Sequence, residues 1–208
     1  MFKKMNLLPG KFTALLGLAL IPAISLATDY VEGKDIPAEL RPFVLPNTRL
    51  LAYEMADLNA DGKPDYVFIL EKQKKQPDDV PIDEGQRPLK IAIRQVDGKL
   101  KLVKTNEKIV FCSACGGVWG DPFADLKADK KGFTVSHFGG SGWRWANDYQ
   151  FNYSRKDDTW QLVKVSELSF HASDPDKVKE KIYTPPKHFG KIDIADFDPE
   201  KFKGVGAK

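Results

Sequence analysis

The chain has 208 residues, with 32 Lys and Arg, 29 Asp and Glu, and a formal net charge of +3. Residues 1–27 contain Lys3, Lys4 and Lys11 but no acidic residue, so the rest of the chain holds equal numbers of basic and acidic residues. This balance argues against nucleic acid and anionic lipid as partners, because both bind clustered, uncompensated Lys and Arg. The 42% hydrophobic content, with 11% aromatic residues, excludes an intrinsically disordered chain.

Residues 1–27 have the three-part layout of a secretory signal peptide. Lysines come first, an apolar run follows over residues 12–20, and Ser25 and Ala27 place small side chains at the third and first positions before a cleavage site. The apolar stretch is shorter than the roughly 20 residues of a membrane-spanning helix. We therefore expect cleavage after Ala27, no membrane insertion of the mature chain, and a periplasmic or secreted location in a bacterium.

The next residues, 28–48, carry Pro37, Pro42 and Pro46 and no sustained periodicity, which predicts an N-terminal arm with a short helix around residues 36–43. From residue 49 onward, short β-type runs alternate with turn signals. The runs cover residues 50–55, 66–70, 89–96, 100–105, 109–111, 124–128, 133–138, 143–153 and 160–170. We expect residues 49–208 to form a single β-rich domain.

The connections between these runs are typical of hairpins. Asp97-Gly98, residues 130–132 and residues 155–158 supply Gly or Asp, which tolerate the positive φ of tight turns. Residues 91–96 and 99–104 alternate apolar and polar side chains, as strands with one buried face do. We predict a mainly β fold with antiparallel sheets from successive hairpins, arranged as a sandwich or a propeller-like meander, and one or two short helices near the termini.

A segment between the first two runs, residues 57–65, has the spacing of a calcium loop. Oxygen-bearing side chains stand at its positions 1, 3, 5 and 9: Asp57, Asn59, Asp61 and Asp65. Gly62 lets the chain bend, and the Lys63 carbonyl is the natural additional ligand for Ca²⁺, which takes about six to eight oxygens. An EF-hand is excluded, because Phe68 replaces its glutamate and a strand follows. A turn without metal is the alternative, since Asp, Asn and Gly favour turns.

The same segment resembles the calcium site of integrin-type (FG-GAP) β-propeller repeats, written D-x-N-x-D-G-x-x-D and followed by apolar residues. The resemblance implies one Ca²⁺ ion that orders the hairpin, bound through the Lys63 carbonyl and four side chains, those of Asp57, Asn59, Asp61 and Asp65. The repeat family carries several copies of this site and the present chain carries one. The resemblance therefore concerns the ion site and not a whole propeller.

Residues 73–87 mix Lys, Asp and Pro with few apolar side chains, which predicts a long exposed loop. This loop is either a solvated insertion or an arm that meets a partner.

Cys112 and Cys115 are the only cysteines, and they are spaced C-x-x-C. In an oxidising compartment they should form a disulfide across a short turn. Zinc is not expected, because the three histidines lack ligand spacing. Thiol redox catalysis is an alternative, but it needs a lowered cysteine pKa, usually at a helix N-terminus, and the glycine-rich residues after Cys115 do not begin a helix.

Residues 137–145 are rich in Gly and Trp. On a strand, Trp143 and Trp145 share one face and Arg144 points to the other. An exposed aromatic face would bind a partner, whereas a buried one would be core. The candidate binding surface comprises Trp119, His137, Ser141, Trp143, Arg144 and Trp145.

The segments that begin at Cys112 and at His137 together resemble a group of uncharacterised exported bacterial proteins. These proteins pair C-S-x-C-G-G-x-x-G-D-P with H-x-G-G-S-x-W-R-W and end near a phrase like residues 184–192. The resemblance covers most of the mature chain and implies a common fold. It supplies no function, because the group has no assigned activity.

A hydrolase is a further alternative. Ser141 or Ser113 as nucleophile, His137 as base and Asp121 as its orienting partner would supply a catalytic triad, which is defined by geometry and not by chain order. The sequence lacks the strand-to-helix setting of a G-x-S-x-G nucleophile.

At the C-terminus, residues 174–181 predict a short helix with Ser173 as its cap, ended by Pro185 and Pro186. The spaced apolar residues of 189–202 predict a tail that packs back on the domain.

These patterns predict an exported, calcium-stabilised binding or accessory protein of the bacterial envelope, such as an inhibitor or immunity-type protein, with no catalysis. Its partner would be an envelope or secreted protein, bound through residues 73–87 or 139–145. The alternatives are a periplasmic thiol-disulfide oxidoreductase that uses Cys112 and Cys115, and a hydrolase that uses His137.

Overall fold

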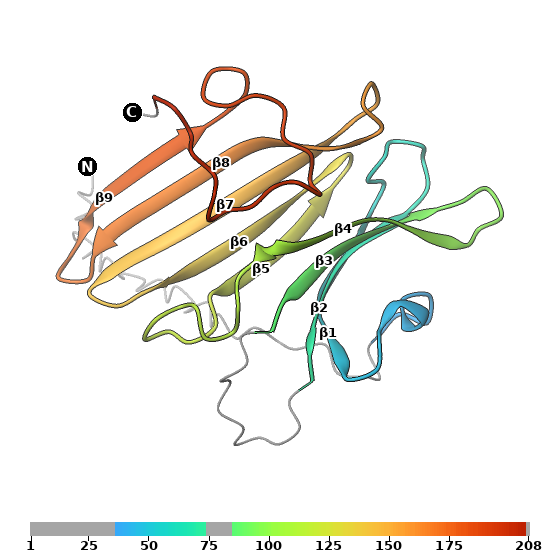
Figure 1. The fold of residues 1–208 in the computed structure, drawn as a ribbon, viewed down its shortest axis with the longest axis horizontal. Helices are drawn as coiled ribbons and strands as arrows, with labels where there is room; N and C mark the ends of the chain where they lie inside the picture. Colours follow the sequence, from blue (N-terminus) through green and yellow to red (C-terminus); the bar gives the residue numbers. More distant parts are fainter. Residues whose placement is uncertain (1–35, 74–84, 207–208) are drawn as a thin grey trace, which may run out of the picture.

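The computed structural model describes residues 36–73 and 85–206, and Figure 1 shows their arrangement. The predicted signal peptide, residues 28–35 of the predicted arm and residues 74–84 of the predicted exposed loop lie outside the described residues. Within the described part of the chain, no helix is long and apolar enough to cross a membrane.

The described residues form two antiparallel sheets, which confirms the predicted fold class. Each sheet is a meander, because every strand pairs with the next one along the chain. Sheet A consists of β1 (Thr48–Ala56), β2 (Asp65–Lys72), β3 (Arg87–Arg94) and β4 (Leu100–Val110). Sheet B consists of β5 (Phe123–Asp129), β6 (Gly132–Gly140), β7 (Trp143–Ser154), β8 (Thr159–His171) and β9 (Asp174–Tyr183).

The predicted tight turns form, but in the turn at residues 130–132 the left-handed φ falls on Lys131 and not on the expected Gly132. Left-handed φ values occur at Gly98 (82°) between β3 and β4, at Lys131 (77°) between β5 and β6, and at Asp158 (50°) between β7 and β8. The Lys131 N–H donates to the Asp57 carbonyl at 2.9 Å, and the Lys131 carbonyl accepts from the Tyr153 N–H at 2.6 Å. These two hydrogen bonds hold a residue with a side chain in a conformation that favours glycine.

One hydrophobic core lies between the two sheets. It contains side chains of both sheets and of the C-terminal segment, residues 184–206, among them Val67, Ile69, Ile91, Val135, Phe151, Leu162 and Phe197. A second cluster covers the opposite face of sheet A, where Leu40 packs with Leu50, Phe68 and Leu70. Since β2 contributes alternate residues to both clusters, it is buried on both faces and its sequence is almost continuously apolar.

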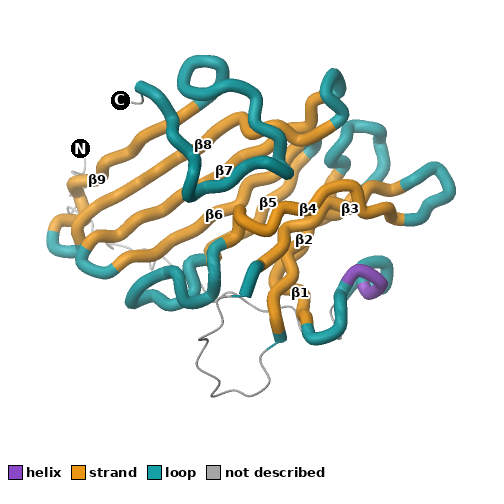
Figure 2. The backbone as a smooth tube through the Cα atoms, viewed as in Figure 1, coloured by secondary structure: helices purple, strands orange, loops and turns teal. Residues whose placement is uncertain are grey.

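The C-terminal segment completes the core, as the sequence predicts, and Figure 2 shows it passing over one face of sheet B. Asn106 of β4 holds it: the Asn106 side-chain amide donates to the carbonyl oxygens of Ile194 (2.6 Å) and Phe197 (2.8 Å). The other side-chain atom, Oδ1, accepts from the N–H groups of Lys108 and Ile109. Asn106 is buried, and all of these bonds satisfy its amide.

Two predicted elements differ from the structure. The helix predicted for residues 174–181 is wrong, because these residues form β9, in which Lys177, Lys179 and Lys181 alternate with residues of the opposite face and pair with β8. The helix predicted for residues 36–43 is reduced to one 3-10 turn, Arg41–Phe43, after which the backbone becomes extended at Val44. In addition, the predicted runs 100–105 and 109–111 belong to one continuous strand, β4.

Candidate functional site

The acidic loop, residues 57–65, joins β1 to β2 and curls around its own side chains. The Asp57 carboxylate accepts hydrogen bonds from the N–H groups of Asp61 (3.0 Å) and Gly62 (3.2 Å). Asn59 Oδ1 also accepts from the Asp61 N–H, at 3.0 Å. Gly62 has φ 89°, the left-handed conformation that the sequence predicts at this position. The structure thus brings Asp57, Asn59 and Asp61 together.

Asp65 differs from the other acidic side chains of the loop, because it is fully buried. Its two carboxylate oxygens accept hydrogen bonds from the N–H groups of Leu58 (3.0 Å) and Arg94 (2.9 Å). Burial raises the pKa of Asp65, and these hydrogen bonds act in the opposite direction. Asp65 therefore fastens the base of the loop to β3.

The donor chemistry of the acidic loop fits a hard cation, because every predicted side-chain ligand is an oxygen. A carboxylate oxygen that accepts one N–H bond keeps a further lone pair for a cation. Among the described residues, however, no group of three or more His, Cys, Asp or Glu side chains is arranged to hold a metal ion. A calcium ion at this loop would therefore depend on the Asn59 amide and the Lys63 carbonyl in addition to the carboxylates.

Cys112 and Cys115 form a disulfide at the start of a compact loop, residues 111–122, which links β4 to β5. We call it the disulfide loop. After the disulfide the chain forms turns: the Gly116 N–H donates to the Gly120 carbonyl at 2.7 Å, and no helix follows. The loop is anchored on the β6–β7 hairpin, because the Gly140 N–H donates to the Gly116 carbonyl at 2.9 Å. A Cβ on Gly117 of the loop would lie 2.8 Å from the Gly140 carbonyl oxygen of the hairpin, so this close approach requires glycine.

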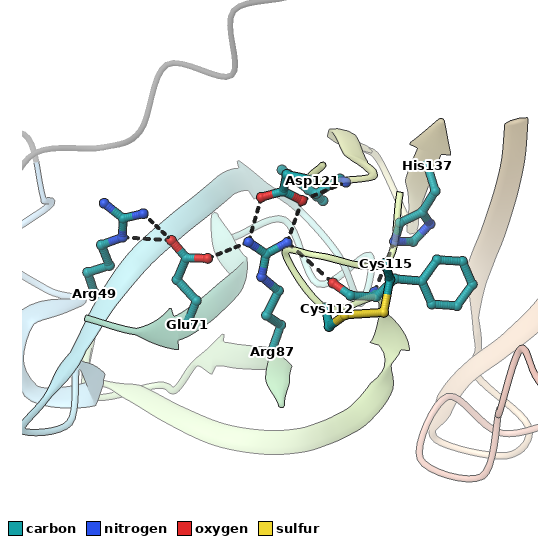
Figure 3. A network of polar contacts seen from close by, with 9 residues as sticks. Arg49, Glu71, Arg87, Cys112, Cys115, Asp121 and His137 are labelled. Carbon is teal, nitrogen blue, oxygen red and sulfur yellow. Dashed lines mark hydrogen bonds and ion pairs between the residues drawn. A yellow bond between two sulfur atoms is a disulfide. The ribbon is translucent and has the colours of Figure 1, made fainter. Parts of the chain in front are cut away.

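A buried ionic network ties sheet A to the disulfide loop (Figure 3). Arg87, the first residue of β3, is only 2% exposed. Its guanidinium makes a bidentate pair with Asp121 of the disulfide loop, with both contacts at 2.6 Å, and a third contact at 2.6 Å with Glu71 of β2. Glu71 also accepts from Arg49 of β1 at 2.6 Å. Two positive and two negative charges therefore neutralise one another, which makes burial of Arg87 tolerable.

His137 lies beside this network and is 1% exposed, so its place in the predicted binding surface is wrong. Its ring packs against Phe111 (centroids 4.5 Å apart) and Tyr149 (5.8 Å). Nε2 accepts a long hydrogen bond of 3.4 Å from the Phe111 N–H, and Nδ1 is buried without a hydrogen-bond partner among the described residues. Burial lowers the pKa of His137 to about 4, the Arg87 charge adds to this effect and Asp121 opposes it. The imidazole is therefore neutral at pH 7.

The residues of the predicted triad are not assembled. His137 forms no hydrogen bond with Ser113, Ser141 or Asp121, all of which are described residues. Both carboxylate oxygens of Asp121 accept hydrogen bonds from Arg87, and Ser141 is exposed in the turn between β6 and β7. A base that cannot reach a nucleophile and has no orienting carboxylate lacks the geometry of a hydrolase.

The tryptophans of the predicted binding surface lie on different sides of sheet B. Trp143 lies on the face of sheet B that is turned toward the core, and it is 58% exposed. Its ring contacts His171 edge-on, with centroids 5.2 Å apart. Trp145 is partly buried against Phe111. Trp119 is 55% exposed and belongs to the opposite, outer face, where it packs on Phe138 with centroids 5.5 Å apart.

The outer face of sheet B follows from the strand register. His137 points to the core, so its neighbour Phe138 points outward, together with its cross-strand partner Ala146. Arg144 also points outward, and its guanidinium carbon lies 5.0 Å from the centroid of the Trp119 ring. We call this group the outer patch; its members are Trp119, Phe138, Arg144, Ala146, Leu168 and Phe170.

Sequence reasoning missed Arg87, Glu71 and Arg49. The sequence pattern places Arg87 at the end of an exposed loop, whereas in the structure it begins β3. Glu71 and Arg87 are separated by 16 positions and Arg87 and Asp121 by 34, so no local spacing connects them. One signal in the sequence could have indicated the network: Glu71 is a charged residue that directly follows the apolar run of β2.

A comparison of this chain with protein families, with curated proteins and with solved structures found no match. The site must therefore be interpreted from its own chemistry.

Proposed function

We propose that this chain is an exported, calcium-stabilised binding or accessory protein of the bacterial envelope, and that its partner is another envelope or secreted protein. The observation that carries the proposal is that Trp119 and Trp143 are each more than half exposed on a well-packed β scaffold. Exposed aromatic side chains are typical of binding surfaces, because they offer a large contact area for little loss of conformational entropy. The specific form of this function that we propose is an inhibitor or immunity-type protein.

The rigidity of the surface supports the same proposal. Trp119 belongs to a loop that is closed by the disulfide, hydrogen-bonded to the β6–β7 hairpin, and held to sheet A through Asp121 and Arg87. A surface that is ordered before it binds loses less conformational entropy on association. Two exposed tryptophans on fixed supports are therefore suited to protein binding.

The arrangement of groups argues against both catalytic alternatives. His137 is inaccessible and neutral, and it lacks a serine partner. In thiol redox proteins a helix N-terminus usually stabilises the thiolate, and here turns follow Cys115. The disulfide is better explained as a clamp on the loop that carries Trp119.

The partner proposal is tested by capture from a bacterial envelope fraction on the immobilised full chain, alongside Trp119→Ala and Trp143→Ala variants. We expect a protein that the wild type retains and that at least one variant loses. Equal retention by both variants, or retention of nothing, would contradict a function that depends on the exposed tryptophans.

The calcium proposal is tested by thermal denaturation in EDTA and after addition of millimolar Ca²⁺. Loops of this kind bind with dissociation constants of about 10⁻⁴–10⁻³ M, so a few-fold excess adds about 1 kcal/mol, or roughly 2–4 °C in Tm. Asp61→Ala should abolish the shift. Asp97→Ala is the matched control, since Asp97 also accepts a backbone N–H in an exposed turn. A wild type that does not respond to Ca²⁺ would overturn this part of the proposal.

A further inference from the structure

Arg144 is the one member of the outer patch that carries a charge, and the fold leaves that charge uncompensated. Among the described residues, its guanidinium has no hydrogen-bond or ion-pair partner, and its Nη1 is buried without an acceptor. Its contact with the Trp119 ring, at 5.0 Å, is a cation–π interaction. A buried N–H without an acceptor is destabilising, and a single ring at an exposed site recovers only part of that loss.

The nearest strand neighbours of Arg144 on the outer face are apolar, and the acidic Glu180 of β9, which pairs with Leu168, lies further out on the same face. The direct cross-strand neighbours of Arg144 are Gly140 of β6 and Phe170 of β8. The next residue along β7 on this face is Ala146, which pairs with Phe138 and Leu168. Every one of these neighbours is partly exposed, so the apolar surface around the guanidinium is open to a ligand.

This combination identifies the ligand chemistry. A planar guanidinium binds a carboxylate through two parallel hydrogen bonds, and the pair strengthens when apolar groups exclude water from it. Arg and Trp are also the residues that most often dominate the energy of protein interfaces, especially where apolar neighbours surround them. An acidic polysaccharide would offer carboxylates but few apolar groups to cover Phe138, Leu168 and Phe170.

We propose that the outer patch binds a segment of a partner protein in which an Asp or Glu side chain is flanked by apolar residues, with the carboxylate bound to Arg144 and an apolar side chain packed beside Trp119. The assignment rests on the binding function proposed above and specifies its surface. The disulfide loop holds Trp119 in place before binding, and Phe138 supports its ring from the sheet.

The test uses the full chain and a phage-displayed library of random 12-residue peptides as the probe. We expect the wild type to select peptides with an acidic residue between apolar ones. For a synthetic peptide of this type, Arg144→Met in the protein or Glu→Gln in the peptide should each weaken binding at least tenfold. The two changes together should weaken it no further, because they remove the same contact. Trp119→Ala should also weaken binding at least tenfold, and Arg144→Lys should weaken it by less than Arg144→Met.

Met55→Ala is the matched control, because Met55 of β1 is 55% exposed, as Trp119 is, but belongs to sheet A and to neither proposed binding surface. It should leave the peptide affinity within twofold. Melting temperatures of all variants close to that of the wild type show that the changes act on binding and not on folding.

Three results would overturn the assignment. The first is selection of no peptide, or of peptides without an acidic residue or insensitive to Arg144→Met. The second is preferential binding of an alginate oligomer, which would make the ligand a polysaccharide. The third is self-association that Trp119→Ala abolishes, which would make the occupant a second copy of the chain.

The two proposals can fail separately. An envelope partner lost with Trp143→Ala but retained by Trp119→Ala and Arg144→Met would leave the binding function in place and overturn the outer patch as its surface.

Discussion

Arg87 and Arg144 both contact the disulfide loop, but the loop offers their charges different partners. It supplies Arg87 with the Asp121 carboxylate in a bidentate pair, and it supplies Arg144 with the indole ring of Trp119. Arg87 is almost completely buried and has carboxylate partners on two sides, whereas Arg144 is partly exposed and has no hydrogen-bond acceptor among the described residues.

The difference separates a structural charge from a charge that is available for binding. A guanidinium sealed inside a protein must be neutralised by the protein itself, because the cost of an unpaired buried charge is large. A guanidinium at an open apolar surface keeps part of its hydration and can exchange that water for a ligand carboxylate. One loop therefore contributes both to stability and to the proposed recognition surface.

The largest expected effect comes from removing the partner of the structural arginine. Asp121→Ala should lower the free energy of unfolding by about 3–5 kcal/mol, because it removes the bidentate partner of the buried Arg87 and leaves Arg87 to share the single carboxylate of Glu71 with Arg49. For a chain of this size the loss corresponds to roughly 10 °C in Tm, measured by circular dichroism. Asp125→Ala makes the same chemical change at an exposed ion pair with Lys127 and should alter stability by no more than about 0.5 kcal/mol. Equal losses in the two variants would contradict a structural role for the pair.

An intermediate effect is expected on acidification, through His137. Its pKa in the folded protein, about 4, lies below its ordinary value of 6.5, so the unfolded chain binds this proton first as the pH falls. The folded state should therefore lose stability between pH 6.5 and pH 4, by up to about 3 kcal/mol.

The His137→Phe variant isolates this contribution. It keeps an aromatic ring next to Phe111 and Tyr149 but cannot be protonated. Glu54 and Asp65, whose pKa values burial raises, titrate alike in both proteins, so the difference between the two urea-denaturation series reports His137 alone. If the free energies of unfolding of wild type and variant change with pH in parallel, His137 gains a proton more easily than its burial suggests.

The smallest effect on stability is expected at the arginine assigned to binding. Arg144→Met should change the free energy of unfolding by no more than about 0.5 kcal/mol, because it removes no hydrogen bond or ion pair between described residues. The same substitution at Arg87 is the comparison and should cost several times more. A loss at Arg144 above about 2 kcal/mol, measured by urea denaturation, would show that its charge is structural and would remove the contrast between the two arginines.

The sequence predicts those parts of the fold that depend on local pattern. The strands and hairpins follow from alternation and from turn residues such as Gly98 and Asp158, since both act over a few positions. The same local rule was available for β9, where Lys177, Lys179 and Lys181 alternate with Val178, Glu180 and Ile182. Its high Lys and Glu content, which favours helix, concealed the period of two.

The candidate site was less predictable, because it depends on contacts across the fold. The spacing of Asp57, Asn59 and Asp61 predicts a tight loop with its side chains turned inward, and the hydrogen bonds of the Asp61 N–H to Asp57 and Asn59 agree with such a loop, whereas the calcium ion stays a prediction. Burial of His137 and the partners of Arg87 depend on how β3 meets the disulfide loop, which no short pattern encodes. For Arg144, the alternation rule gave the correct face, but only the paired strands reveal that its neighbours are apolar.

The hydrogen bonds of Asn106 to the C-terminal segment also bear on the order in which the parts of the core can fold. The Asn106 side-chain amide donates to the carbonyl oxygens of Ile194 and Phe197, which lie 88 and 91 positions further along the chain. The Phe197 side chain is part of the core between the two sheets. Contacts between such distant positions form late, because closing long segments of chain costs entropy before any packing compensates for it. Ile194 and Phe197 can therefore take their places in the core only after the strands of both sheets have been made.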